Sequence, residues 1–144
     1  MAKTASTAKT STIDRATLLP HPDISRYCGD LETWPRSWMG WEKDLPLGEA
    51  LVACFRPFLE YLVNSGLSRK TIRKHADNLW LLGGEIIRDL NETSSLRKLP
   101  VERLLINAVS DGGPLLYHCD SEEQQRSFDS TCRKLCRFLA QTAR

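Results

Sequence analysis

The feature that most constrains this chain is a stripe of large apolar residues that repeats at helical spacing from residue 47 onward. The stripe passes through Leu47, Leu51, Phe55, Phe58 and Leu62 in steps of four, four, three and four. Such steps keep the side chains on one side of an α-helix, because its period is about 3.6 residues. No segment alternates apolar and polar residues over the length of a strand. The sequence therefore predicts an all-α fold.

The first predicted helix contains Pro57 and ends at Gly66, a residue type that favours the turn after a helix. We expect a kink or a restart at Pro57. A second helix begins after Ser68, which is a good N-cap residue. The pair Gly83-Gly84 interrupts this helix. Because each glycine costs roughly 1 kcal/mol relative to alanine inside a helix, we expect a kink or a close helix crossing there.

Two further helices follow. One is predicted from Pro100 to Val109, and turn residues at 111–114 separate it from a last helix that opens at the capping sequence of residues 121–124. Together the segments predict a compact bundle of four or five helices with an irregular N-terminal strap. The residues expected to fill its core are Leu51, Phe55, Phe58, Leu62, Ile72, Leu79, Ile86, Leu105, Phe128, Leu135 and Leu139.

The composition changes near residue 46, and we divide the chain there. Residues 1–46 are predicted to form a flexible polar arm and a tryptophan-rich strap, and residues 47–144 the helical bundle domain. Prolines discourage a long helix in the first region, so we expect at most a short helical turn at residues 36–41 and a mobile arm at residues 1–12. Its tryptophans have two interpretations, because they either anchor a protein partner or cover the helical core. These residues are Trp34, Trp38 and Trp41.

Composition places the chain among single-domain cytoplasmic proteins. Its 144 residues are 41% hydrophobic and 26% charged, which is close to globular averages. No stretch approaches the ~18 consecutive apolar residues of a membrane span. The chain has no apolar signal-peptide core near its N-terminus, and its five cysteines are an odd number. Free thiols in a reducing cytosol are the simplest interpretation.

The densest group of cations lies at the start of the second helix, on the side away from its apolar face. Within this group, which comprises Arg69, Lys70, Arg73 and Lys74, there is no acid. Cations near the positive end of a helix dipole are locally unfavourable, and a bound phosphate would relieve that repulsion. The alternative is a solvated face that keeps the protein soluble. Since the formal net charge is only +2, any nucleic-acid site must come from such local clustering.

Residues 58–62 (FLEYL) are followed by a turn at 64–66 (NSG) and by LSRKTI at 67–72. This succession resembles the core-binding domain of tyrosine recombinases, the phage integrases. The resemblance covers residues 47–90 and implies a SAM-like bundle that grips one face of duplex DNA. At the matching positions, the DNA contacts it implies are Ser68, Arg69, Lys70, Thr71, Arg73 and Lys74.

The resemblance does not extend to a catalytic domain. That domain needs a His-x-x-Arg signature and a nucleophilic tyrosine, and neither His75 nor His118 has an arginine three residues on. His75 also stands where the family usually has an aromatic residue. No phosphate-binding loop or metalloprotease motif is present. We therefore predict that the chain is not an enzyme and needs no cofactor.

Four soft ligands near the C-terminus suggest a tetrahedral zinc site as an alternative. These ligands are His118, Cys119, Cys132 and Cys136. Cys132, however, lies on the apolar stripe of the last helix, where cysteine packs as a small hydrophobe. There is also no Cys-x-x-Cys pair. We predict no metal and no disulfide.

Two functions follow from these patterns. The first is a non-enzymatic DNA-binding module that holds the duplex backbone, as an accessory protein of a mobile element. The second is a protein-interaction module, such as a small phage- or plasmid-encoded inhibitor or adaptor, that binds a partner through the tryptophan-rich strap. Salt dependence separates them, because phosphate binding weakens steeply with salt and an apolar interface hardly responds.

Overall fold

The computed structural model describes residues 22–142, and over this range the chain is helical, with five α-helices and no strand. The prediction of an all-α bundle is therefore confirmed. The mobility expected for residues 1–12 lies outside the described residues. The helices are α2 (Trp34–Trp38), α3 (Asp44–Asn64), α4 (Arg69–Glu92), α5 (Val101–Val109) and α6 (Glu122–Thr142), with three 3-10 helices, η1 (Ile24–Arg26), η2 (Leu31–Thr33) and η3 (Ser94–Lys98).

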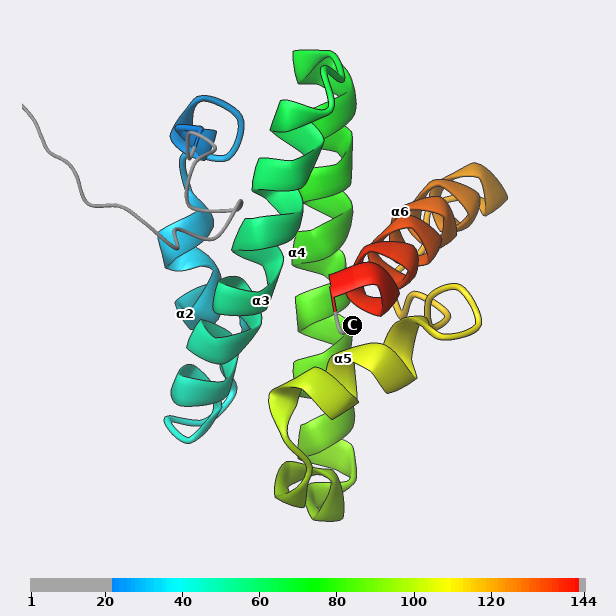
Figure 1. Ribbon diagram of the computed structural model, residues 1–144. Coiled ribbons are helices and arrows are strands. Elements are labelled where there is room, and N and C mark those ends of the chain that lie inside the picture. Colours follow the sequence, from blue (N-terminus) through cyan, green and yellow to red (C-terminus); the bar gives the residue numbers. More distant parts are fainter. Residues whose placement is uncertain (1–21, 143–144) are drawn as a thin grey trace, which may run out of the picture.

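The two long helices α3 and α4 run antiparallel and form the centre of the bundle (Figure 1). The tight turn that joins them contains Gly66, whose φ of 79° is a left-handed conformation that glycine adopts without strain. The segment with η1, η2 and α2 packs on α3, while α5 and α6 cover the other side of the pair. No described helix is both long and apolar enough to cross a membrane.

The core lies where α3, α4, α5 and α6 meet, and it contains nearly all the residues expected there. Leu51, Phe55, Phe58 and Leu79 are fully buried. The expected burial of Leu139 is wrong in degree, because this residue is only half-buried at the edge of the core. It lies near the end of α6, where fewer elements cover the helix. The other predicted core residues are all buried, namely Leu62, Ile72, Ile86, Leu105, Phe128 and Leu135.

Helix boundaries differ from the expected ones by a few residues, for reasons of proline geometry. Helix α3 begins at Asp44, ahead of the apolar stripe, since Pro46 falls in the first turn, where a missing backbone N–H costs nothing. It continues through Pro57 without restarting. Pro100 is the N-cap of α5 rather than its first helical residue. The short helix in the strap begins at Trp34, two residues before the expected turn.

Helix α4 runs unbroken through Gly83 and Gly84. The ring of Trp38 packs against this glycine pair. A Cβ atom built on Gly83 would lie 2.2 Å from Cζ2 of the Trp38 ring, so only glycine leaves room for the indole. The indole Nε1 donates a hydrogen bond to the backbone oxygen of Trp80 at 2.9 Å. The expected close crossing is therefore the contact between α2 and α4, and the strap shares one core with the helices.

Candidate nucleic-acid interface

The N-terminus of α4 is capped as expected. The Oγ atom of Ser68 accepts a hydrogen bond from the backbone N–H of Thr71 at 3.1 Å, and it donates one to Oγ1 of Thr71 at 3.0 Å. Ser68 is exposed and Thr71 is half-buried. The cap fixes the start of the helix and hence the direction in which the following cations project.

The structure brings the four predicted cations together on one exposed surface, here called the basic cluster (Arg69, Lys70, Arg73 and Lys74). They line an open depression of about 700 Å³, together with Asp77 and Asn78. None of the four takes part in an ion pair within the part of the chain that the structure describes. Unneutralised cations gathered on one helix face form a ready site for an anion.

The cluster is held at its outer edge by the strap. The guanidinium of Arg69 lies over the ring of Tyr27, with Cζ 5.7 Å from the ring centroid. This cation–π contact leaves the charge of Arg69 unneutralised while restricting the position of its side chain. Because the first turn of α4 adds the positive end of the helix dipole, the whole region favours bound negative charge.

The inward face of the same helix segment is fixed by buried polar contacts with α6. Nδ1 of His75 lies 2.7 Å from Oγ1 of Thr131, within hydrogen-bond distance. The amide nitrogen of Asn78 donates to that same oxygen at 2.9 Å and to the backbone oxygen of Ser127 at 3.2 Å. These contacts fix the packing of α4 on α6, so the basic cluster is presented by a rigid element.

Burial lowers the pKa of His75 to about 4, and the neighbouring Lys74 and Lys134 lower it further in the same direction. The imidazole is therefore neutral at pH 7. It is 3% exposed, so it has no access to a substrate. His75 is a packing residue rather than a proton-transfer group.

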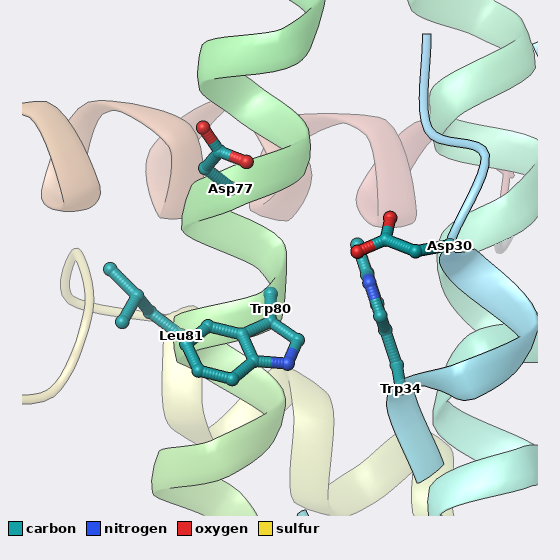
Figure 2. Close-up of a pocket in the computed structure, with 5 residues that line it drawn as sticks. All are labelled: Asp30, Trp34, Asp77, Trp80 and Leu81. Atoms are coloured by element: carbon teal, nitrogen blue, oxygen red, sulfur yellow. The ribbon is translucent and has the colours of Figure 1, made fainter. Parts of the chain in front are cut away.

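A second hollow adjoins the basic cluster, between α4 and the segment around η2 (Figure 2). Its volume is about 380 Å³, and we call it the tryptophan pocket (Asp30, Trp34, Asp77, Trp80 and Leu81). Asp30 and Trp34 stand on one side of it, and the other three residues project from α4 (Figure 2). Sequence reasoning missed this pocket. The one signal was that Trp80 follows Arg73 by seven residues, which places both on one side of a helix.

The strap tryptophans fall into two groups. Trp34 and Trp38 are 3% and 9% exposed, so they cover the helical core. Trp41 is 62% exposed, and the Nζ atom of Lys43 lies 5.9 Å from its ring centroid. The backbone N–H of Trp41 donates to Asp44 at 2.9 Å, which fixes the turn that carries the ring. Of the three residues considered as a partner anchor, Trp41 is thus the one whose ring faces solvent.

The thiols show no arrangement suited to metal binding. Among residues 22–142, no three side chains of the types His, Cys, Asp and Glu lie close enough together to hold a metal ion. Cys132 is fully buried, and burial raises its pKa to about 12, which keeps the thiol protonated. It packs with Phe128 and Leu135 in the core, as its place on the apolar stripe indicated.

Comparison with known proteins yields no relative from which a role could be transferred. No family model, no curated protein and no solved structure matches this chain.

Proposed function

We propose that this chain is a non-enzymatic DNA-binding module that holds the phosphate backbone of a duplex against the first two turns of α4. The observation that carries the proposal is the basic cluster, in which four exposed cations share one surface without a salt-bridge partner in the described chain. Phosphate contacts from lysine, arginine and helix N-termini position proteins on DNA without reading its sequence.

The charge distribution supports a local rather than a general attraction. The formal net charge is +2, so the rest of the molecule contributes little to binding a polyanion. A duplex backbone that contacts the basic cluster displaces counterions from DNA, and this release drives binding at low salt. Ser68 and Thr71 lie at the same helix terminus and would supply hydroxyl contacts to the backbone.

The resemblance of residues 58–72 to the core-binding domain of tyrosine recombinases is consistent with this proposal. On that basis we assign the chain to the accessory proteins of mobile elements, acting in the cytoplasm. The residues that the resemblance implies as DNA contacts, at positions 68–74, include all four cations of the basic cluster.

The test is to replace all four cations of the basic cluster with glutamine and to measure the affinity for a short duplex at ~100 mM salt. We expect binding to be lost, while thermal unfolding stays close to that of the wild type. A matched control replaces four exposed cations elsewhere, Lys43, Lys98, Arg103 and Arg133, and should retain binding. Equal loss in both variants would show a non-specific charge effect and contradict the assignment of the site.

Trp41 supports the second candidate, a module that binds a protein partner. A ring that is 62% exposed on a fixed turn resembles an interface anchor. If wild-type protein shows no affinity for duplex DNA even at low salt, the DNA proposal is wrong and this candidate replaces it. Trp41→Ala should then abolish partner binding, and the variant without the basic cluster should bind normally.

A further inference from the structure

The basic cluster and the tryptophan pocket are two parts of one surface. Asp77 lines both hollows, and all four cations and Trp80 project from α4. Trp80 follows Arg73 by seven residues, which is about 10 Å along the helix axis, or roughly three base-pair rises of DNA. The distance from the cluster to the pocket is therefore short enough for one DNA segment to span.

The two carboxylates of the pocket have no role in a site that binds only phosphate. Asp30 and Asp77 are both exposed, and neither forms an ion pair within the described residues. Carboxylates only accept hydrogen bonds, and beside a phosphate they repel it. Beside the basic cluster they are attracted by its cations, but next to a bound phosphate they are favourable only where the ligand also carries hydrogen-bond donors.

Trp80 supplies a flat surface at the same place. Its side chain is 41% exposed, and its Nε1 donates a hydrogen bond to Oγ of Ser37 at 2.9 Å. The backbone of Trp80 is held as well, since its oxygen accepts the hydrogen bond from Trp38. The ring is therefore preorganised, with its Nε1 edge anchored and part of its surface exposed.

We propose that the tryptophan pocket takes one unpaired base of the DNA whose phosphates the basic cluster holds, with the base stacked on Trp80 and its amino group donating to Asp77 or Asp30. This proposal rests on the proposed function and extends it from the backbone to a base. The pocket volume of about 380 Å³ lies within the range of small-ligand sites, roughly 300–1,000 Å³. Stacking on an aromatic side chain is the usual way in which unpaired bases are bound.

The chemistry of the pocket favours a nucleotide over a basic peptide. An arginine or lysine side chain would suit two carboxylates and an indole, but it would approach the four unpaired cations next to them. A nucleotide suits both the basic cluster and the tryptophan pocket. Its phosphate is anionic, and its base combines a π surface with hydrogen-bond donors. Bases that carry an exocyclic amino group fit the carboxylates, so cytosine should be preferred to thymine.

The experiment compares three short duplexes that differ at one position: fully paired, with one extrahelical cytosine, and with one extrahelical thymine. We expect the full-length protein to bind the cytosine duplex at least about five-fold more tightly than the paired one, the lower end of base–aromatic stacking. Trp80→Ala should remove this gain and leave the affinity for paired DNA unchanged, which also shows that the variant is folded. Trp80→Phe should restore much of the gain.

Asp77→Asn provides a second, opposite signature. Removing this charge beside the basic cluster should raise the affinity for paired DNA, because it removes a repulsion. The same substitution should narrow the difference between the cytosine and thymine duplexes, because an amide also donates to thymine while Asp30 still accepts from cytosine. Loss of affinity for all three duplexes would show a structural effect and overturn the role given to Asp77.

Tryptophan fluorescence gives a readout independent of affinity. The chain has four tryptophans, of which Trp34 and Trp38 are buried, so in a Trp41→Phe background the exposed emitter is Trp80. The cytosine duplex should quench this emission and the paired duplex should not. Quenching by a short oligolysine peptide but by none of the duplexes would overturn the proposal in favour of a site for basic peptides.

The outcomes separate this inference from the proposed function. One outcome is equal affinity for all three duplexes, together with loss of that affinity when the basic cluster is replaced. This result would overturn the proposal of a base in the tryptophan pocket and would support phosphate binding by the basic cluster. No affinity for any duplex would overturn both.

Discussion

The two faces of α4 use polar side chains in opposite ways. On the face that packs against α6, His75 and Asn78 are buried, and each has a hydrogen-bond partner on α6. On the outward face, Arg69 and Arg73 lie a turn away along the same helix, exposed and without an ion pair in the described chain. Both faces carry polar side chains, and on the inward face these two lie among apolar residues such as Ile72 and Leu79.

The difference shows which groups serve the fold and which remain for a ligand. Buried polar groups must be paired, because leaving one unpaired costs about 1–3 kcal/mol. Exposed like charges carry no such requirement, and their mutual repulsion costs the folded state a little stability. In α4 the inward residues His75 and Asn78 are paired, and the cations on the outward face have no ion pair in the described chain. This arrangement presents the cations to a ligand.

The largest expected contrast between the faces concerns stability. Leu79 is fully buried on the inward side of α4, and Leu79→Ala should lower the free energy of unfolding by ~2–5 kcal/mol. Arg73→Gln, two turns earlier on the outward side, should change it by less than ~0.5 kcal/mol. Urea unfolding of the two variants measures both values. A comparable loss for Arg73→Gln would mean that the outward face also supports the fold.

The next contrast concerns pH. The pKa of His75 is about 4 in the folded protein, against 6.5 for an unperturbed histidine, because burial first and then Lys74 and Lys134 disfavour the charged form. The unfolded chain therefore binds a proton at a higher pH than the folded one. The contribution of His75 to stability should be constant above pH 6.5 and be lost as the pH drops from 6.5 to 4, by up to about 3 kcal/mol.

His118 provides the matched control for this prediction, because it is exposed on the loop before α6. The measurement is the urea midpoint at pH 7 and at pH 4.5 for wild type, His75→Gln and His118→Gln. The difference between the two pH values should shrink in the first variant and persist in the second. An undiminished difference in His75→Gln would assign the acid sensitivity to other groups.

The features of the fold and of the candidate site that the sequence predicted are those that depend on residues close together along the chain. The helices, the Ser68 cap and the inward burial of Leu79 follow from spacing along the chain, so pattern analysis found them. The basic cluster was also accessible, since its members lie within two helical turns. Each of these features depends only on neighbours near in sequence.

Which distant segments meet was not predictable from the sequence. Three tryptophans lie within eight residues of the strap, yet Trp34 and Trp38 are buried and Trp41 is exposed. Trp38 fits where the glycine pair of α4 leaves room for its indole, and Trp34 packs against Trp38 and Phe55 of α3. The tryptophan pocket likewise needs Asp30 from the strap and Asp77 from α4, and no local pattern indicates that they meet.

The smallest expected contrast lies at the boundary between the two faces of α4, in the adjacent glycines beneath Trp38. A Cβ atom on Gly83 would lie 2.2 Å from Cζ2 of the indole, whereas one on Gly84 would lie 3.5 Å from Cδ1, an ordinary contact. Because the Trp38 ring is held by its hydrogen bond to the backbone of Trp80, it has little freedom to move aside. Gly83→Ala should therefore destabilise the protein by ~1–3 kcal/mol through overpacking. Gly84→Ala should stabilise it by up to ~1 kcal/mol, the helix-propensity difference, so thermal melts shifted in the same direction would contradict the placement of the indole.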